Sequence, residues 1–151
     1  MSQSLCKFYV HLIYHIKTTS PIIRNEDLFR VFTYIVTLIN STGCHAIKVG
    51  GIGDHVHILF QLSKDKTIVS IVKDIKANSS RWLRELDPYY KSFAWQTGYG
   101  AFSVSQSLVE KTSNYIEHQK EHHSRKSFKE EYLAFLNLYE VQYDERYLFT
   151  D

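Results

Sequence analysis

The stretch 53–61 constrains the fold more than any other part of the chain, because its side chains alternate in character. Side chains two residues apart in an extended strand project from the same face, so His55 and His57 share one face. The opposite face carries three apolar side chains, those of Val56, Ile58 and Phe60. The pattern predicts a strand that buries its apolar side in a core and holds two imidazoles on the other side.

The remaining pattern of apolar residues predicts the order strand, helix, strand, strand, helix, strand. Strands are expected over 6–16, 44–49, 55–62 and 99–104, and helices over 25–43, 67–86, 106–123 and 127–139. A turn is expected over Gly50–Asp54, and the tail from Val141 shows no periodicity. This order is the split βαβ pattern of the α+β ferredoxin-like fold, a four-stranded antiparallel sheet with helices on one face. The other face is expected to be open, with a C-terminal helix packed toward it.

Size and composition indicate one globular domain over residues 1–151. A chain of 17.8 kDa with 44% hydrophobic residues can bury a core without disulfides. No apolar run approaches the roughly 20 residues that span a bilayer, and the first residues lack the pattern of a signal peptide. A cytoplasmic protein without a membrane partner is therefore expected.

The formal net charge of +2 predicts nothing about nucleic acid, but its distribution does. Residues 64–91 hold seven basic and four acidic side chains, and most of the basic ones avoid the apolar stripe of the predicted helix. A local basic surplus suits contacts to phosphates, although a solvated helix face has the same appearance. The candidate phosphate contacts are Lys73, Lys76, Arg81 and Arg84.

Two paired motifs carry the predicted chemistry. The imidazoles of His55 and His57 can bind two adjacent positions of a divalent metal, which then needs a further ligand. Tyr115 and Gln119 are four residues apart on a predicted helix and so lie on one face. A tyrosine hydroxyl titrates near pH ~10 and is a poor nucleophile unless a metal polarises its target, and a phosphodiester suits that arrangement. A covalent tyrosine–DNA link keeps the energy of the broken bond, which points to cutting and rejoining DNA.

Each motif has a plainer explanation. A His-x-His pair on a strand is more often a surface pair or part of another metal site, and a helix tyrosine is usually packed at a core edge. His118, His122 and His123 could be extra ligands, but imidazoles are also favoured near a helix C-terminus by the macrodipole. A non-catalytic nucleic-acid module on the same fold would stack bases on exposed aromatic residues of the sheet, for which Tyr9 is available.

In combination, the motifs resemble the single-tyrosine, single-strand DNA transposases of the HUH endonuclease class, encoded by small bacterial insertion sequences and by relatives associated with repeated palindromes. The resemblance covers nearly the whole chain. It is carried by the segments 9–14, 53–59, 72–82, 93–105, 115–119 and 143–148. Relaxases usually place the tyrosine before the histidine strand, opposite to the order here, and replication initiators commonly carry a further domain.

The resemblance implies a role for each paired residue. His55 and His57 would bind Mg²⁺ or Mn²⁺ with Gln119 as the third ligand, and Tyr115 would form a 5′-phosphotyrosine intermediate. It also implies that the partners are hairpins of single-stranded DNA and a second copy of the chain, whose tyrosine helix can complete the site in trans. A membrane or a small-molecule substrate is not expected. Either a mobile element or a domesticated nuclease acting on repeated palindromes would fit.

Overall fold

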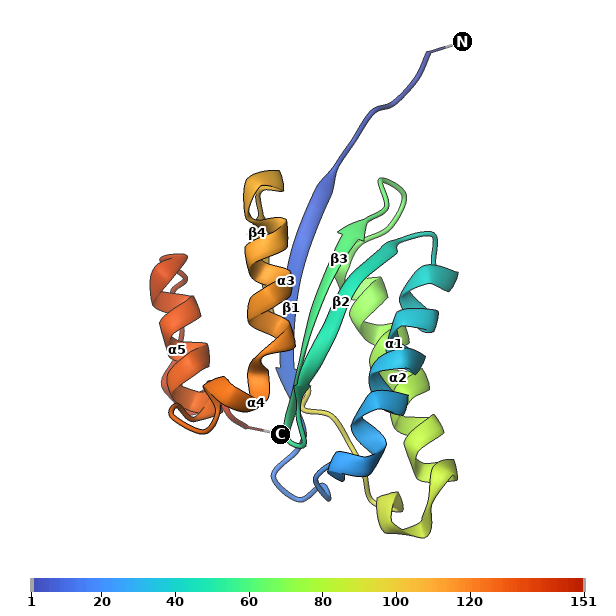
Figure 1. Ribbon diagram of the computed structural model, residues 1–151, viewed down its shortest axis with the longest axis vertical. Coiled ribbons are helices and arrows are strands. Elements are labelled where there is room, and N and C mark those ends of the chain that lie inside the picture. The colour runs from blue at the N-terminus through green and yellow to red at the C-terminus, as the bar shows by residue number, and fades with distance from the viewer. Residues whose placement is uncertain (1, 151) are drawn as a thin grey trace.

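The computed structural model describes residues 2–150 and confirms the predicted order of strands and helices (Figure 1). The strands are β1 (Phe8–His15), β2 (His45–Ile52), β3 (His55–Leu62) and β4 (Gly100–Val104). The helices are α1 (Asn25–Ser41), α2 (Ile68–Leu86), α3 (Val109–Glu117), α4 (Gln119–His122), α5 (Phe128–Leu138) and α6 (Glu145–Leu148). Two short 3-10 helices, η1 (Pro88–Tyr90) and η2 (Gln106–Leu108), complete the described elements.

The four strands form one antiparallel sheet in the order β2-β3-β1-β4, which is the ferredoxin-like arrangement expected from the sequence. The turn between β2 and β3 is shorter than predicted. Gly50 and Gly51 pair with His57 and Val56, so β2 continues to Ile52 and only Gly53–Asp54 remain as the turn. Such a short connection fixes the register of the hairpin.

Helices α1 and α2 cover one face of the sheet and close the main core (Figure 1). The apolar side chains predicted to point inward from β1 and β3 do so, including Leu12, Ile58 and Phe60, which are fully buried. Thr67 caps α2, because its hydroxyl oxygen accepts a hydrogen bond from the backbone N–H of Ser70 at 3.1 Å. Helix α1 begins at Asn25 as predicted, and α2 begins at Ile68, one residue after its predicted start.

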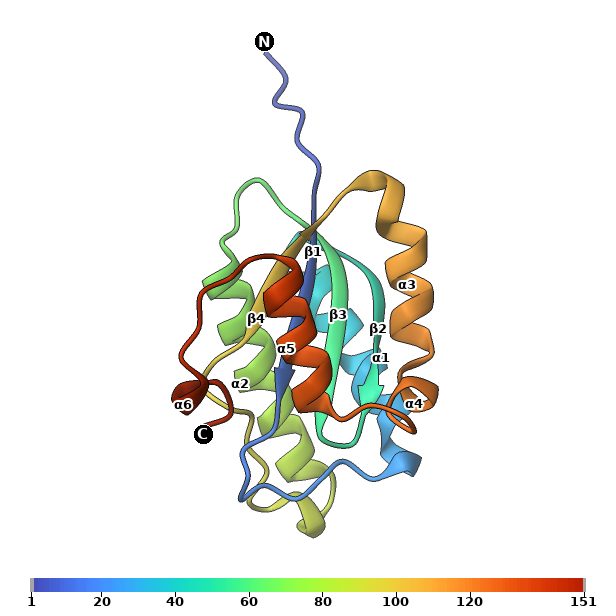
Figure 2. The same ribbon diagram turned by 90° about the vertical axis from the view of Figure 1, so that its left-hand side faces the viewer.

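The second face of the sheet is not open, which corrects that part of the expectation. Figure 2 shows α5 lying across β1 and β4, while α3 lies beside β2. This face also carries apolar side chains, and two small clusters bury them: one groups Ile13 and Phe102 with Tyr132 and Leu136, the other Leu59 and Val104 with Ile116. Their burial favours a covered face, which also removes the histidines of β3 from solvent.

The helix predicted over 106–123 is divided into η2, α3 and α4. The break falls at His118, whose Nδ1 lies 2.6 Å from the carbonyl oxygen of Asn114. This side-chain contact competes for a carbonyl that the helix would use, a common reason for a helix to end. The tail contains α6, which the sequence did not predict. Over residues 2–150, none of the helices has the length and apolar character that crossing a bilayer requires.

Candidate metal and nucleophile site

His55 and His57 project from β3 into the space between the sheet and the helices α3 to α5, and both side chains are fully buried. Each ring is held through Nδ1. His55 Nδ1 donates to the carboxylate of Asp54 at 2.7 Å, and His57 Nδ1 lies 2.8 Å from Nε2 of His11 on the neighbouring strand β1. Partners at Nδ1 fix the ring orientation and leave each Nε2 directed into the site, as in many metal-binding histidines.

The two halves of the site predicted from the sequence lie together in one chain. Gln119 Oε1 is 2.9 Å from His55 Nε2, and the ring centroids of Tyr115 and His57 are 5.9 Å apart. Gln119 is buried, whereas Tyr115 is partly exposed. Because the break at His118 separates them, Tyr115 lies in the last turn of α3 and Gln119 begins α4. The predicted proximity is therefore right, although the predicted continuous helix is wrong.

A carboxylate that the sequence reasoning missed, that of Glu131 on α5, joins these groups. Its Oε1 accepts a hydrogen bond from His57 Nε2 at 2.9 Å, and its Oε2 accepts from Gln119 Nε2 at 3.0 Å and from the Tyr115 hydroxyl. Glu131 is only 3% exposed. A signal was present in the sequence: a residue three after Phe128 and four before Phe135 shares their apolar helix face. A charge on such a face needs a buried partner.

Burial and hydrogen bonding shift the pKa values of His57, Glu131 and Tyr115. Burial lowers the pKa of His57 to about 4 despite the adjacent carboxylate, so the imidazole is neutral at pH 7. Burial alone would raise the pKa of Glu131, but hydrogen bonds from His57, Tyr115 and Gln119 outweigh it and hold that pKa well below its usual range. Burial and then the bond to Glu131 raise the pKa of Tyr115, so its hydroxyl keeps its proton.

The donors present suit a divalent cation. Nitrogen or oxygen atoms of His55, His57, His123 and Glu131 all lie within 4.8 Å of one another. The Nδ1–H of His55 donates to Asp54, and in that tautomer Nε2 carries a lone pair that faces Gln119 Oε1, 2.9 Å away. The amide cannot relieve this opposition by turning, since its Nε2 donates to Glu131. Two lone pairs facing each other are stabilised by a shared cation, so the residues fit a metal.

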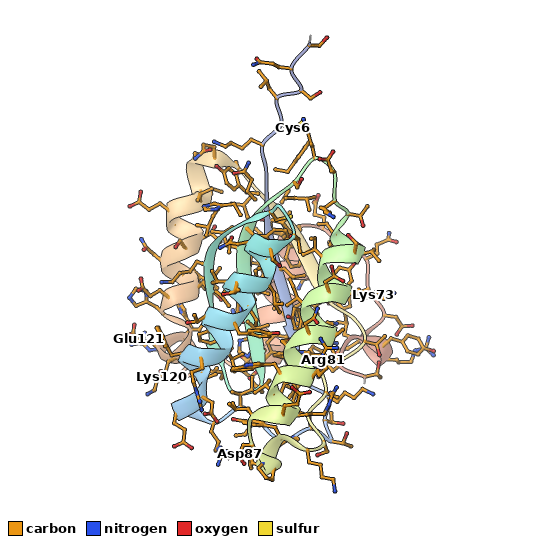
Figure 3. All side chains as sticks on the ribbon, turned by 90° about the vertical axis from the view of Figure 1, so that its right-hand side faces the viewer. Cys6, Lys73, Arg81, Asp87, Lys120 and Glu121 are labelled. Atoms are coloured by element: carbon orange, nitrogen blue, oxygen red, sulfur yellow. The ribbon has the colours of Figure 1, made fainter. Side chains whose placement is uncertain are left out.

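The basic side chains of α2 do not lie with this group. Helix α2 covers the opposite face of the sheet, and Figure 3 shows Lys73 and Arg81 on that side. Lys76 is half-buried, and its ammonium donates to the three carbonyl oxygens of residues 96–98 at 2.7–3.2 Å. Burial also lowers the pKa of Lys76 to about 8. Arg84 donates to the carbonyl oxygen of Phe93 at 3.2 Å.

A cavity of about 570 Å³ opens beside Tyr115 and is lined by Tyr115, Glu131 and the segment 121–126. This segment contributes Arg125 and Lys126, whose side chains are exposed. The cavity therefore joins a hydroxyl, a buried donor cluster and positive charge. Such a combination suits a phosphodiester that must approach the tyrosine from solvent.

The chain is similar to known proteins in sequence and in fold. The family described as transposase, IS200-like, matches residues 4–119. A crystal structure of a candidate transposase from Deinococcus radiodurans R1 has a TM-score of 0.60 and 21% identity, covering 79% of this chain and 98% of that one. The structure of a REP-associated tyrosine transposase bound to a REP hairpin has a TM-score of 0.58 and 12% identity, covering 82% of this chain and 74% of that one. At these identities the two structures establish the shared fold. No curated protein matches the chain.

Proposed function

Because this chain belongs to the IS200-like transposase family, we propose that it cuts and rejoins single-stranded DNA through a covalent link to Tyr115. One observation carries the proposal. The Tyr115 hydroxyl and His57 Nε2 donate to the two oxygens of a single buried carboxylate, that of Glu131, so nucleophile and metal donors meet within one side chain. A structural tyrosine at a core edge does not require such a neighbour.

In the proposed reaction, the Tyr115 hydroxyl oxygen attacks the phosphorus of the scissile phosphodiester. The new bond joins this oxygen to phosphorus, and the bond from phosphorus to the 3′ oxygen of the preceding nucleotide breaks. The hydroxyl loses one proton and the departing 3′ oxygen gains one, so the step is balanced and leaves a 5′-phosphotyrosine and a free 3′ hydroxyl. Attack by a 3′ hydroxyl on the phosphotyrosine reverses these changes and rejoins a strand without ATP.

We assign His55, His57 and Gln119 as ligands for Mg²⁺ or Mn²⁺. The bound ion would act as a Lewis acid and template for the scissile phosphate. The chain itself holds the ligands in place: Asp54 orients His55, and His11 orients His57. A neutral His57 would offer the lone pair of Nε2 to the ion when its single ring proton is on Nδ1, where His11 Nε2 can accept it. The raised pKa of Tyr115 is consistent with a hydroxyl that becomes a nucleophile only beside a polarised phosphate.

We propose hairpins of single-stranded DNA as the substrate. The family match supports this, and the REP-associated transposase of similar fold was solved with a REP hairpin. The basic residues of α2 are proposed to contact DNA away from the chemical step. The protein is proposed to act as a homodimer, as the sequence resemblance implies. Mixing a His57→Ala variant with a Tyr115→Phe variant tests exchange of the tyrosine helix, because activity returns only if one subunit completes the site of the other.

The test of the proposed reaction is a 5′-labelled and a 3′-labelled single-stranded hairpin oligonucleotide incubated with the protein and Mn²⁺. The expected result is a protein–DNA adduct that carries the 3′ portion of the strand and is resolved on a denaturing gel. Tyr115→Phe should abolish the adduct, and Tyr147→Phe is the control because Tyr147 is an exposed tyrosine of the tail. Absence of an adduct, or an adduct that survives Tyr115→Phe, refutes the proposal.

A non-catalytic module that stacks bases on the sheet has less support. That reading needs exposed aromatic residues on the face of β1 and β3, but α3 and α5 cover this face. Tyr9, the aromatic residue it relied on, packs against Val104 and Leu59 and donates its hydroxyl to Gln106 at 2.8 Å. A domesticated nuclease acting on repeated palindromes would use the same active site as the transposase of a mobile element. The two therefore differ in their DNA targets and not in the residues of the site.

A further inference from the structure

The carboxylate of Glu131 lies among the proposed ligands His55, His57 and Gln119 but has no role in binding the metal so far. It lies on α5, outside the residues matched by the family, and 12 positions beyond Gln119. Its Oε1 is 2.9 Å from His57 Nε2, 3.2 Å from His123 Nε2 and 3.6 Å from His55 Nε2. One oxygen therefore contacts or approaches every imidazole of the cluster.

These distances are close to those between atoms that bind one ion, although the two shorter ones are also hydrogen-bond distances. Two ligand atoms about 2.1 Å from an octahedral cation and at right angles lie about 3.0 Å apart, and at a tetrahedral angle about 3.4 Å apart. The separations from Glu131 Oε1 span 2.9–3.6 Å, and Gln119 Oε1 lies 2.9 Å from His55 Nε2. The Glu131 oxygen meets the same condition as the amide oxygen that was assigned from the sequence.

The proton between His57 and Glu131 gives a second reason for Glu131 to bind the ion. In the metal-free chain, His57 Nε2 donates its proton to Glu131 Oε1. An ion that binds this nitrogen needs the other neutral tautomer of His57, in which the ring proton is on Nδ1 and faces His11 Nε2. That change removes the hydrogen-bond donor of a buried carboxylate oxygen. A buried charged oxygen without a partner is strongly unfavourable, and the nearest available partner is the same ion. Binding at His57 therefore recruits Glu131.

Charge favours this assignment as well. Two neutral imidazoles and an amide bring no negative charge to a buried divalent ion, whereas hard cations such as Mg²⁺ and Mn²⁺ prefer carboxylate oxygens. Glu131 supplies one negative charge at the cluster, and its backbone is fixed because neighbouring Tyr132 and Leu136 pack against the sheet. Its second oxygen still accepts from the Tyr115 hydroxyl and from Gln119.

We propose that Glu131 is a direct metal ligand, so that the centre is a carboxylate site with His55, His57 and Gln119, and that its other oxygen holds the Tyr115 hydroxyl beside the ion. This inference rests on the proposed function, because it assumes that the two histidines bind a metal. Glu131 meets the requirements of a ligand whether His123 is a further ligand or donates a hydrogen bond to the oxygens beside it.

The test is the affinity of the full chain for Mn²⁺, measured without DNA by the loss of the free-ion electron paramagnetic resonance signal. Glu131→Gln keeps the shape of the side chain and removes its charge. Outer-shell substitutions commonly cost 10–100-fold in metal affinity, so loss of an anionic ligand should weaken Mn²⁺ binding by at least about tenfold. Glu130→Gln is the matched control, because Glu130 is the exposed neighbour on the same helix and should bind as the unmodified chain does.

A second readout separates a ligand from a residue that only supports the fold. With Co²⁺ in place of Mn²⁺, loss of a ligand should change the visible absorption spectrum of Glu131→Gln but not that of Glu130→Gln, and Mn²⁺ should raise the melting temperature less in the former. The assignment is overturned if Glu131→Gln binds Mn²⁺ at least as strongly as the unmodified chain and His57→Ala loses Mn²⁺ binding. If His55→Ala and His57→Ala also bind Mn²⁺ normally, the metal site of the proposed function fails instead.

Discussion

Gly50 on β2 offers a direct test of how closely the tyrosine helix must approach the sheet. A Cβ atom built at Gly50 would lie 2.6 Å from the carbonyl oxygen of Ile116 and 2.9 Å from its Cγ2. Ordinary van der Waals contact begins at 3.4 Å, so Gly50→Ala requires a movement of about 3.4 − 2.6 = 0.8 Å. Because Ile116 follows Tyr115 directly, the helix that moves is the one that carries the proposed nucleophile.

The expected effects differ for stability and for catalysis. Overpacking typically costs about 1–3 kcal/mol. Replacing a strand glycine by alanine offsets about 0.5–1 kcal/mol of this. The free energy of unfolding should therefore fall by about 1 kcal/mol, within a range of roughly 0–2.5 kcal/mol. A displacement near 1 Å at a reacting group can lower a rate by about 100-fold, so adduct formation with a hairpin oligonucleotide should fall by roughly that factor in folded protein.

The measurements are urea unfolding and the rate of adduct formation at saturating Mn²⁺. Gly98→Ala is the matched control, because the nearest atom to a Cβ there is Gln96 Nε2 at 3.7 Å. This control should unfold and react as the unmodified chain does. Gly50→Ala with unchanged stability and rate would show that the close packing of α3 on β2 does not position the tyrosine.

Two further predictions concern pH and DNA. In metal-free protein, burial lowers the pKa of His57 to about 4, against 6.5 in the unfolded chain, so the unfolded state binds the proton first as the pH falls. The contribution of His57 to the free energy of unfolding is therefore complete above pH 6.5. It should fall by about 3 kcal/mol as the pH drops to about 4. Urea unfolding in EDTA checks this, and stability that stays constant across the window contradicts it. Arg125→Ala and Lys126→Ala, beside the cavity, should slow adduct formation and lower the salt dependence of hairpin binding by about one unit each. Lys73→Ala and Arg81→Ala, on the opposite face, should weaken hairpin binding without slowing adduct formation. Unchanged adduct formation in the Arg125 and Lys126 variants would contradict the proposed approach of DNA through the cavity.

The sequence predicted the sheet well because alternation in β1 and β3 follows directly from strand geometry. His55 and His57 could be assigned to one face for the same reason. Their nearness to Tyr115 and Gln119 needed the family resemblance, since contacts between segments about 60 residues apart have no local signature. Glu131 was missed because its helix was treated as core packing, although its charge on an apolar face was visible.

Two other differences arise from side-chain contacts that a pattern of apolar residues does not encode. The break at His118 depends on a single contact to the carbonyl oxygen of Asn114. The role of Lys76 depends on the path of residues 96–98, which direct three carbonyl oxygens at its ammonium. A lysine on the polar side of a predicted helix gives no sign of such an internal contact.

The two-residue turn at Gly53–Asp54 limits how related genes can change in length at this point. Surface loops usually tolerate insertions, but here one added residue that shifted the pairing by a single position would exchange the two faces of β3. The imidazoles would then enter the apolar layer beneath α1 and α2, and Val56 and Ile58 would enter the site. Length at this turn should therefore be a simple genomic marker, separating copies that can still encode an active enzyme from decayed remnants whose histidines remain in the sequence.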